Sequence, residues 1–378
     1  MKVYLDNAAT TPIDPDVLKT MYKVMKDTHG NPSSIHAHGR EARSLIERSR
    51  KTVARLLHVS PAEIFFTSGG TEADNTAITG GVSTGGIKHV ITARTEHHAV
   101  LHTLEAMARQ GSVRLSYVNL DAGGRPDPDH LDQLLEHHDR SLISLMHANN
   151  ETGALLDLET VAALSAKHDA IFHCDTVQTV GHYQLDPGKL PLHFMTCAAH
   201  KLHGPKGIGF LYVNPAVKIA PLIYGGSQER NMRGGTENVY GIVGLARALE
   251  IACEQMDAHS KYIQELKNYM TERLRATIPG VQFNGPLDPE ESLYTVLNVS
   301  FPPTENAEML LFNLDINGIS ASGGSACSSG SDIGSHVLTA INADPDRPSV
   351  RFSFSKYNTK EEIGYTVEKL QELMKVSV

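Results

Sequence analysis

The chain has 378 residues, of which 40% are hydrophobic and 20% are charged, and its formal net charge is −9. A chain of this length can bury a large core and is expected to form two domains or one large α/β unit with an appendage. The acidic balance argues against a nucleic-acid partner, whose binding domain is normally basic, and gives no attraction to an anionic membrane surface.

The sequence predicts a cytoplasmic protein. No apolar run is long enough to span a bilayer, so we expect no transmembrane helix and no membrane partner. The first residues, MKVYLDNAATTP, lack the apolar segment of a secretory signal, which indicates the start of a mature protein.

Short apolar runs recur through the first two-thirds of the chain and predict β-strands, because bulky and β-branched residues favour an extended backbone. Nearly continuous apolar strands fit a sheet that is covered on both faces. The predicted strands are Glu63–Thr67, His89–Ala93, Val113–Val118, Ser141–Met146, Ile171–Cys174, Phe194–Cys197 and Gly209–Val213.

Segments with helical spacing lie between these strands. They are Glu72–Gly80, His98–Gln110, Pro128–His137 and Leu158–His168. Strand–helix alternation of this kind predicts an α/β fold built on a seven-stranded, mostly parallel sheet.

The pattern changes in the last third of the chain. A long helix is predicted over Val239–Leu274, and it could bridge two domains. Beyond it, a smaller α+β unit is predicted from Thr295–Phe301, Met309–Asn313, Val350–Phe354 and a final helix, Lys360–Val376. The stretch Ser322–Ser335, SGGSACSSGSDIGS, is poor in bulky residues and predicts a mobile loop.

A glycine turn follows the first predicted strand and leads into a helix, in the sequence Ser68-Gly69-Gly70-Thr71-Glu72. The start of a helix presents free backbone N–H groups and the positive end of the helix dipole, which suit a phosphate. A plain strand–turn–helix capped by threonine explains the same residues. A P-loop is excluded, because no Gly-Lys-Ser/Thr follows.

Two charged residues follow later strands. Asp175 comes directly after Ile171–Cys174, where a carboxylate can either cap a helix or pair with the pyridinium nitrogen of a cofactor. Lys201 lies between an apolar strand and the tight turn GPKG. A lysine is usually a solvated cation, but burial lowers the pKa of an ammonium group and makes the amine a nucleophile for a Schiff base.

The four cysteines are far apart in the sequence, so no CxxC redox or zinc pattern is present. Cys174, Cys197 and Cys253 lie in apolar or helical contexts and are predicted to be structural. Cys327 is flanked by small residues in the predicted loop, where a thiol is either incidental or reactive. No histidine pair with a supporting third ligand predicts a metal site.

Ten stretches together resemble the cysteine desulfurases of the NifS/IscS type, which are fold-type-I pyridoxal-phosphate enzymes of the class-V aminotransferase family. They occur in family order across nearly the whole chain, and together they are highly specific. The stretches are YLDNAATTP at 4–12, GNPSSIH at 30–36, FTSGGTEADN at 66–75, TEHHAV at 95–100, NNETG at 149–153, HCDTVQTVG at 173–181, AHKLHGPKGIG at 199–209, RGGTENV at 233–239, SGGSACSSGS at 322–331 and VRFSF at 350–354.

The resemblance implies a set of residues that bind pyridoxal 5′-phosphate. Lys201 would bind the cofactor covalently, and His97 would stack on its ring and help to move protons. Asp175 would pair with the ring nitrogen, and Gln178 would bond the ring hydroxyl. The phosphate would contact Gly70, Thr71 and His200, together with Thr236 of the neighbouring subunit, which implies a homodimer.

The resemblance also implies how L-cysteine reacts. Asn150 and Arg351 would hold the substrate carboxylate, and Cys327 would attack the substrate sulfur to form a persulfide, with L-alanine as the second product. The serine-rich stretch around Cys327 resembles the long-loop group of the family, which passes sulfur to acceptor proteins for iron–sulfur cluster assembly or tRNA thiolation.

The resemblance implies a large cofactor domain over 14–257 and a small domain over 1–13 and 258–378. One position departs from the family pattern: Ala198 stands where the family usually has a serine that donates to the phosphate. A hydrogen bond to a charged group contributes about 1.5–3 kcal/mol, so cofactor affinity is expected to fall unless Thr196 or a water compensates.

Other fold-type-I enzymes would share part of this site. A selenocysteine lyase, a sulfinate desulfinase or an aminotransferase-like relative would keep Lys201 and Asp175, but only an enzyme that accepts sulfur or discriminates selenium has a role for Cys327. A scaffold protein that keeps the fold without the cofactor is the alternative from another class, and Ala198 is its only support.

Overall fold

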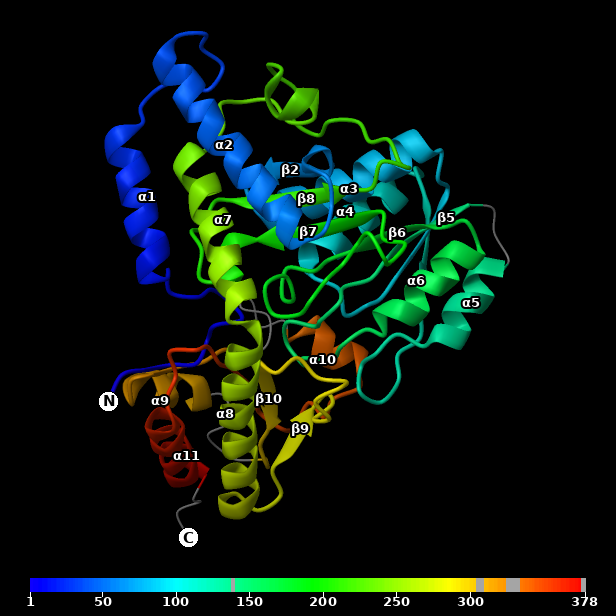
Figure 1. Ribbon diagram of the computed structural model, residues 1–378. Coiled ribbons are helices and arrows are strands. Elements are labelled where there is room, and N and C mark those ends of the chain that lie inside the picture. Colours follow the sequence, from blue (N-terminus) through cyan, green and yellow to red (C-terminus); the bar gives the residue numbers. More distant parts are fainter. Residues whose placement is uncertain (137–139, 304–308, 324–333, 375–378) are drawn as a thin grey trace.

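The structure of the chain is a computed structural model that describes residues 1–136, 140–303, 309–323 and 334–374 (Figure 1). The predicted ends His137 and Val376 and the thiol of Cys327 therefore lie outside the described residues. Within the described part of the chain, no helix combines the length and apolar character needed to cross a membrane.

The seven strands predicted in the first two-thirds of the chain form one sheet (Figure 1). Five neighbouring strands are parallel to one another, whereas β8 is antiparallel to both β2 and β7. The predicted fold class is confirmed. In spatial order the strands are β2 (Ile64–Thr67), β8 (Gly209–Val213), β7 (Phe194–Ala198), β6 (Ile171–Cys174), β5 (Ser141–Ser144), β3 (His89–Thr92) and β4 (Arg114–Tyr117).

Helices cover both faces of this sheet, which explains why its strands are apolar on both sides. Val90 and Leu142 pack against the helices α3 and α4. The next residue of each strand, Ile91 or Ile143, faces the opposite layer. The first layer contains α3 (Gly70–Gly85) and α4 (His98–Arg109), and the second contains α2 (Ala37–Leu56), α5 (Pro128–Glu136), α6 (Leu158–Lys167) and α7 (Val239–Glu254).

The helices α1 (Pro15–Asp27) and α2 were not predicted from the sequence. Asp14 caps α1 by accepting the N–H of Asp16, and Pro15 occupies the first turn, so the start signal is present in the chain. The cap of α2 is the ring of His36, an unusual capping residue that a search for Ser, Thr, Asp or Asn does not find.

The single helix predicted over Val239–Leu274 is wrong, because two helices occupy this stretch. The chain leaves the helical conformation at Gln255, where φ is −115° and ψ is 13°. The helix α7 ends just before this residue and α8 (Met256–Thr277) begins just after it. The two helices follow one another from the large sheet towards the smaller C-terminal part (Figure 1). No glycine or proline marks the break, so the sequence pattern runs straight through it.

The last third of the chain builds a second unit around its own core. Its antiparallel sheet has the order β12 (Ser349–Ser353), β10 (Val296–Ser300) and β9 (Gln282–Asn284), and α8 packs beside α11 (Lys360–Met374). The predicted segment Met309–Asn313 lies at the start of α9 (Leu310–Ile316). The short β11 (Ile319–Ser320) and α10 (His336–Ala340) complete the described elements.

The first residues of the chain belong to this second unit. The strand β1 (Val3–Tyr4) pairs with β11, and Val3 and Leu5 are buried in the second core. Residues 6–11, here called the N-terminal strap, then run along the large unit, where the N–H of Thr11 donates to the carbonyl of His200 at 2.9 Å. The predicted domain limits near residues 13 and 257 stay a prediction.

A buried ion pair fixes the start of β2. Arg50 of α2 makes two contacts of 2.8 Å with the carboxylate of Glu229, and both side chains are almost fully buried. The same carboxylate accepts the N–H of Phe66 at 2.8 Å, and Arg50 also donates to the carbonyl of Ile64 at 2.9 Å. The pair therefore joins α2, β2 and the segment before Thr236.

Arg50→Ala should lower the free energy of unfolding by about 3–5 kcal/mol, because it leaves Glu229 buried without its counter-charge. Denaturant unfolding monitored by circular dichroism measures this value. Arg48→Ala, two positions away on the exposed side of α2, is the matched control and should change the free energy of unfolding little. Equal losses from both variants would contradict the assigned role of the ion pair.

Candidate active site

One cavity of about 400 Å³ brings together most of the residues that the sequence singled out. It opens where the parallel strands end, so residues that follow β3, β5, β6 and β7 all reach it. Arg351 comes to it from β12 of the second unit. The predicted residues that line the cavity are Gly70, Thr71, His97, Asn150, Asp175, Gln178, His200, Lys201 and Arg351.

Thr236 does not line this cavity. It lies instead in a separate recess beside Ser68, Gly207 and Arg233. A role for Thr236 in the cavity of its own chain is therefore not supported by its position.

The start of α3 forms one end of the cavity. The helix begins at Gly70, and Gly69 before it has no side chain to cap the first N–H groups. A Cβ on Gly70 would stand 2.7 Å from Cγ2 of Val177, so only glycine fits there without movement. Free helical N–H groups with Thr71 and His200 beside them form a suitable site for a phosphate.

Ala198 also lines this end of the cavity, and its methyl group offers no hydrogen bond. Of the two compensating groups considered, Thr196 does not lie at this end of the cavity. Thr196 is fully buried, lies outside the cavity lining and directs its hydroxyl to Oδ1 of Asp175 at 3.4 Å. This end of the cavity thus lacks a side-chain hydrogen-bond donor at the end of β7.

Asp175 stands at the end of β6 with its carboxylate in the cavity wall. Its Oδ1 accepts the N–H of Val177 at 2.9 Å, so the side chain stabilises the turn and faces the cavity at the same time. Burial, reinforced by the nearby charge of Asp74, raises the pKa of Asp175 to about 6. A cationic ring nitrogen would stabilise its charged form.

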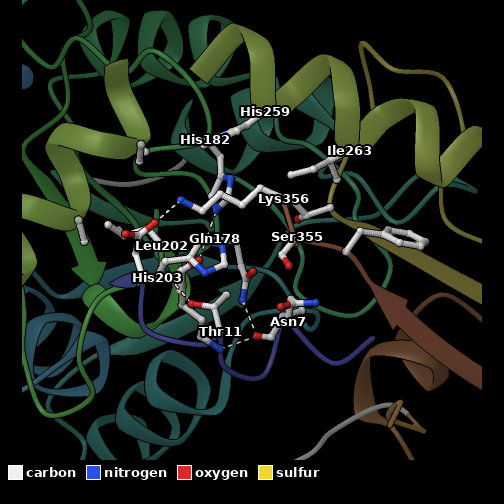
Figure 2. A pocket seen from close by; sticks show the side chains of 18 of the residues that line it. Asn7, Thr11, Gln178, His182, Leu202, His203, His259, Ile263, Ser355 and Lys356 are labelled. Carbon is white, nitrogen blue, oxygen red and sulfur yellow. Dashed lines mark hydrogen bonds and ion pairs between the residues drawn. The ribbon is translucent and has the colours of Figure 1, made fainter. Parts of the chain in front are cut away.

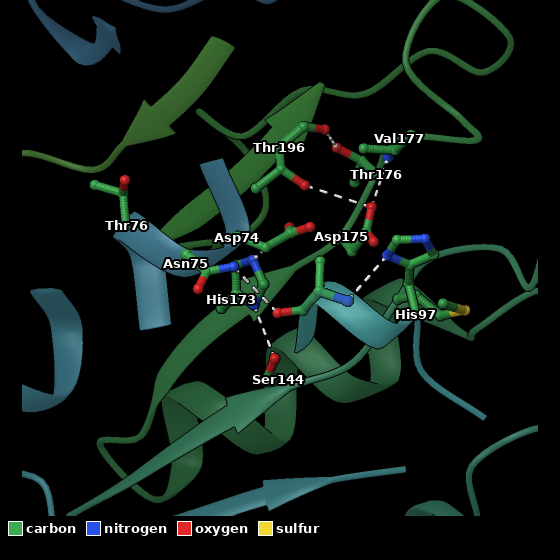
Figure 3. Close-up of polar contacts among 12 residues, drawn as sticks. Asp74, Asn75, Thr76, His97, Ser144, His173, Asp175, Thr176, Val177 and Thr196 are labelled. Carbon is green, nitrogen blue, oxygen red and sulfur yellow. Dashed lines mark hydrogen bonds and ion pairs between the residues drawn. The ribbon is translucent and has the colours of Figure 1, made fainter. Parts of the chain in front are cut away.

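Two further buried acids, Asp74 and Glu96, lie near Asp175, and the sequence interpretation missed them. Figure 3 shows Asp74 beside Asp175. Oδ1 of Asp74 lies 3.4 Å from Nε2 of His173, whose Nδ1 is 2.8 Å from the hydroxyl of Ser144. Burial raises the pKa of Asp74 to about 7, lowers that of His173 to about 4 and raises that of Glu96. Asp74 lies one helical turn after Gly70, so the shared face of α3 could have indicated it.

His97 caps α4 and is held in one orientation. Its Nδ1 accepts the N–H of Ala99 at 3.1 Å, so a neutral ring carries its proton on Nε2. Burial lowers the pKa of His97, and the charge of Lys201 adds to this effect, whereas Asp175 opposes it. In this arrangement Nε2 can donate a proton towards the cavity.

Lys201 ends the short turn Ala199–Lys201 after β7 and is half-buried. Its Nζ donates to the carbonyls of Ala8 and Ala9 at 2.5 and 2.9 Å. Gln178 donates to the carbonyl of Ala8 at 3.1 Å, so the N-terminal strap holds both side chains. Lys201 and Gln178 also line a second cavity of about 30 Å³. Figure 2 shows the side chains that line it.

Arg351 is fully buried in β12 and reaches the cavity from the second unit. Its Nη1 donates to the backbone carbonyl of Asn150 at 2.9 Å, which places both predicted carboxylate-binding residues side by side. Its Nη2 lies 2.8 Å from Oδ1 of Asp6.

These groups fit pyridoxal phosphate. The site combines an uncapped helix start, a buried carboxylate in need of a cation, and a lysine amine at one wall. Among the described residues, no cluster of histidine, cysteine and carboxylate groups is arranged to hold a metal ion.

Asp74→Asn should stabilise the cofactor-free protein at high pH and have little effect at low pH. The pKa of Asp74 is raised from 3.8 to about 7, so the folded state holds a proton that the unfolded state releases. The folded protein therefore loses stability as the pH rises from about 4 to about 7, and an uncharged asparagine removes that loss.

Thermal unfolding over this pH range measures the difference. Asp132→Asn is the matched control with the opposite sign, because Lys167 and His168 lower the pKa of this partly exposed carboxylate. A destabilisation by Asp74→Asn that grows with pH would show that the carboxylate is charged and well paired in the folded state.

Comparison with known proteins identifies relatives over nearly the whole length of the chain. Residues 3–365 match the family model described as aminotransferase class-V. The chain is 43% identical over 378 residues to the cysteine desulfurase IscS of Dictyoglomus turgidum, covering 99% of this chain and 94% of the relative. It is 40% identical over 376 residues to the cysteine desulfurase IscS of Methanosarcina thermophila, covering 98% and 92%.

Solved structures agree with these relatives. A NifS-like protein superposes with a TM-score of 0.91 at 38% identity, covering 99% of both chains. A structure described as SspA in complex with cysteine superposes with a TM-score of 0.80 at 31% identity, covering 95% of this chain and 100% of the other. The chain therefore belongs to the class-V aminotransferase family and, within it, to the cysteine desulfurases of the IscS and NifS type.

Proposed function

We propose that this chain is a pyridoxal-phosphate-dependent cysteine desulfurase that converts L-cysteine to L-alanine and leaves the sulfur as a persulfide on Cys327. The observation that carries the proposal is the convergence of Lys201, Asp175, His97 and Arg351 on one cavity from two units of the fold. This combination provides a covalent anchor, a partner for a ring nitrogen, a ring that can stack and a group for a carboxylate.

The cofactor phosphate is assigned to the start of α3. The free N–H groups at Gly70 and the side chains of Thr71 and His200 surround this end of the cavity. Because Ala198 lacks the serine hydroxyl of the usual family pattern, phosphate binding would depend more on the backbone N–H groups. A lost hydrogen bond of this type corresponds to about 1.5–3 kcal/mol.

The ring end of the cofactor is assigned to Lys201, Asp175 and Gln178. Lys201 would hold the cofactor covalently, Asp175 would pair with the ring nitrogen and Gln178 would donate to the ring hydroxyl. When bound there, the cofactor supplies an electron sink for the charge that develops at the substrate Cα. Asp175 makes this possible because its buried carboxylate favours a cation beside it.

Proton movement is assigned to Lys201 and His97. When its amine is not bound to the cofactor, Lys201 would remove the substrate Cα proton. The strap carbonyls of Ala8 and Ala9 can orient its Nζ. The ring of His97 presents Nε2–H, since Nδ1 is engaged by Ala99. His97 is therefore suited to donate a proton to the substrate.

The substrate carboxylate is assigned to Arg351, with Asn150 beside it. A guanidinium binds a carboxylate through two parallel N–H groups, which orients as well as attracts it. Because Nη1 of Arg351 is fixed on the carbonyl of Asn150, the amino acid would be held at one angle relative to Lys201.

Sulfur transfer is assigned to Cys327, which lies outside the described residues. Its thiolate would attack the substrate sulfur, so that an S–S bond forms while the Cβ–S bond breaks. The electron pair of the broken bond returns to the carbon fragment, which takes up a proton and leaves as L-alanine.

The other thiols support this assignment. Cys174 and Cys197 are fully buried, and burial raises the pKa of both. Cys253 is half-buried and its pKa is also raised by burial. None of these three thiols lines the cavity, and a raised pKa leaves less of the nucleophilic thiolate at neutral pH.

The enzyme is proposed to act as a homodimer, in which Thr236 completes the phosphate site of the partner. Thr236 lies outside the cavity of its own chain, so it is available to another copy. Apolar side chains on α1 support a covered face: Leu18, Tyr22 and Met25 share one side of the helix and are 56%, 66% and 57% exposed. An acceptor protein for iron–sulfur cluster assembly or tRNA thiolation is the proposed recipient of the sulfur.

Cys327→Ala should abolish the release of L-alanine from L-cysteine, because the substrate sulfur loses its acceptor. Alanine formation under reducing conditions measures this, and mass spectrometry of the unmodified enzyme should find the persulfide on Cys327. Cys253→Ala is the matched control and should keep normal activity. Full alanine release by Cys327→Ala would point to a different fold-type-I activity, such as a lyase that needs no enzyme thiol.

Mixed dimers of Lys201→Ala and Thr236→Ala subunits should regain activity. Each variant alone is expected to be impaired at both of its sites. In a mixed dimer, one site combines the intact Lys201 of one subunit with the intact Thr236 of the other. Co-expression with two affinity tags isolates this dimer, and a failure to recover activity would argue against the shared site.

A further inference from the structure

Asp6 lies where three segments of the fold meet. It follows β1 in the N-terminal strap, and its backbone forms a bridge with Ser353 of β12. The hydroxyl of Tyr4 donates to the Asp6 carbonyl at 3.2 Å, which further fixes this part of the strap. The side chain of Asp6 is thereby directed by a backbone that is tied at both ends.

Asp6 contacts Arg351, the residue assigned to the substrate carboxylate. Its Oδ1 lies 2.8 Å from Nη2 of Arg351, and Nη1 of the same guanidinium donates to the carbonyl of Asn150. Arg351 is 1% exposed, and its Nε has no hydrogen-bond partner among the described residues. Two contacts therefore fix the plane of the guanidinium, and the remaining N–H groups on Nη1 and Nη2 are available to a ligand in the cavity that Arg351 lines.

The same carboxylate oxygen also holds Ser322. The hydroxyl of Ser322 donates to Oδ1 of Asp6 at 2.7 Å, and the backbones of Ser322 and Arg351 exchange hydrogen bonds of 2.7 and 3.2 Å. Ser322 stands five residues before Cys327 in the sequence. One oxygen atom therefore joins the arginine to the segment that leads towards the sulfur-accepting thiol.

We propose that Asp6 is a positioning residue for the substrate carboxylate, which sets both the orientation and the effective charge of Arg351. This inference rests on the proposed role of Arg351. The contact with Oδ1 holds the guanidinium at the angle that a carboxylate needs. The negative charge of Asp6 also offsets part of the positive charge of Arg351, which weakens its hold on any carboxylate and favours release of L-alanine.

These two effects are separable by substitution. Both contacts use Oδ1, so an asparagine can keep them while it removes the charge, whereas alanine removes both contacts and charge. Asp6→Asn should therefore bind carboxylates more tightly. Asp6→Ala should bind them more weakly, because the free guanidinium loses its fixed orientation.

The test measures equilibrium binding of L-alanine to the enzyme with its cofactor, from the change in cofactor absorbance. Ethylamine, which is L-alanine without the carboxylate, is the matched ligand. We expect Asp6→Ala to weaken L-alanine binding about tenfold, the size of one charged hydrogen bond, and to leave ethylamine binding unchanged. Asp6→Asn should tighten L-alanine binding severalfold. In turnover, KM for L-cysteine should follow the same directions while kcat changes less.

Arg351→Ala separates this inference from the proposed function. If Arg351→Ala weakens L-alanine binding and neither Asp6 variant changes it, the inference about Asp6 is wrong and the role of Arg351 stands. If Arg351→Ala has no effect on L-alanine binding, the proposed substrate site itself is wrong. Equal weakening of L-alanine and ethylamine by the Asp6 variants would mean a general disturbance of the fold, which also overturns the proposal. Asp132→Asn is the control for the loss of a distant acid.

Discussion

The hydrogen bonds of the N-terminal strap are the constraint on which the rest of the site depends. Residues 6–11 contact groups that are far away in the sequence: Lys201 through the carbonyls of Ala8 and Ala9, and His200 through Thr11. The strap begins in the core of the second unit, where Leu5 is fully buried. A six-residue segment therefore connects the packing of the second unit directly to the reactive amine of the first.

The buried acids impose a second constraint, because they cost free energy in the absence of positive charge. Burial raises the pKa values of Asp175, Asp74 and Glu96; the charge of Asp74 adds to the effect on Asp175, and the charges of Asp175 and Asp74 add to the effect on Glu96. A protein core rarely keeps such a group of carboxyls without a partner. A bound cation beside Asp175 would relieve part of this cost, so the binding of a cationic ring and the stability of the fold favour each other.

Much of the fold and part of the site could be predicted from the sequence. Apolar runs indicated all seven strands of the main sheet, and the ends of those strands indicated Asp175 and Lys201, since side chains after parallel strands gather at one edge. The contacts of Asp6 with Ser322 and with Arg351 could not be predicted in this way, because each joins residues more than 300 positions apart. The break at Gln255 could not be predicted either, because no glycine or proline interrupts the helical pattern there.

Thr196 illustrates a further limit of sequence reasoning. Thr196 and Ala198 lie on the same face of β7, because side chains alternate along a strand, so one could replace the other in principle. The depth along the strand decides otherwise: Thr196 is fully buried beside Asp175, and only Ala198 reaches the cavity. The spacing of residues in the sequence predicts which face of a strand a side chain occupies. It does not predict how far along the strand the ligand site lies.

The reaction needs groups from both units at a fixed separation. Lys201 must reach the substrate Cα, while Arg351 holds the carboxylate on the same carbon, so an error in their relative position cannot be absorbed by the substrate. The strap meets this need because Asp6 contacts Arg351 and, two residues later, Ala8 contacts Lys201. Along an extended chain two residues span about 7 Å, so the strap limits the distance between the two contact points in the way that a short rigid link would.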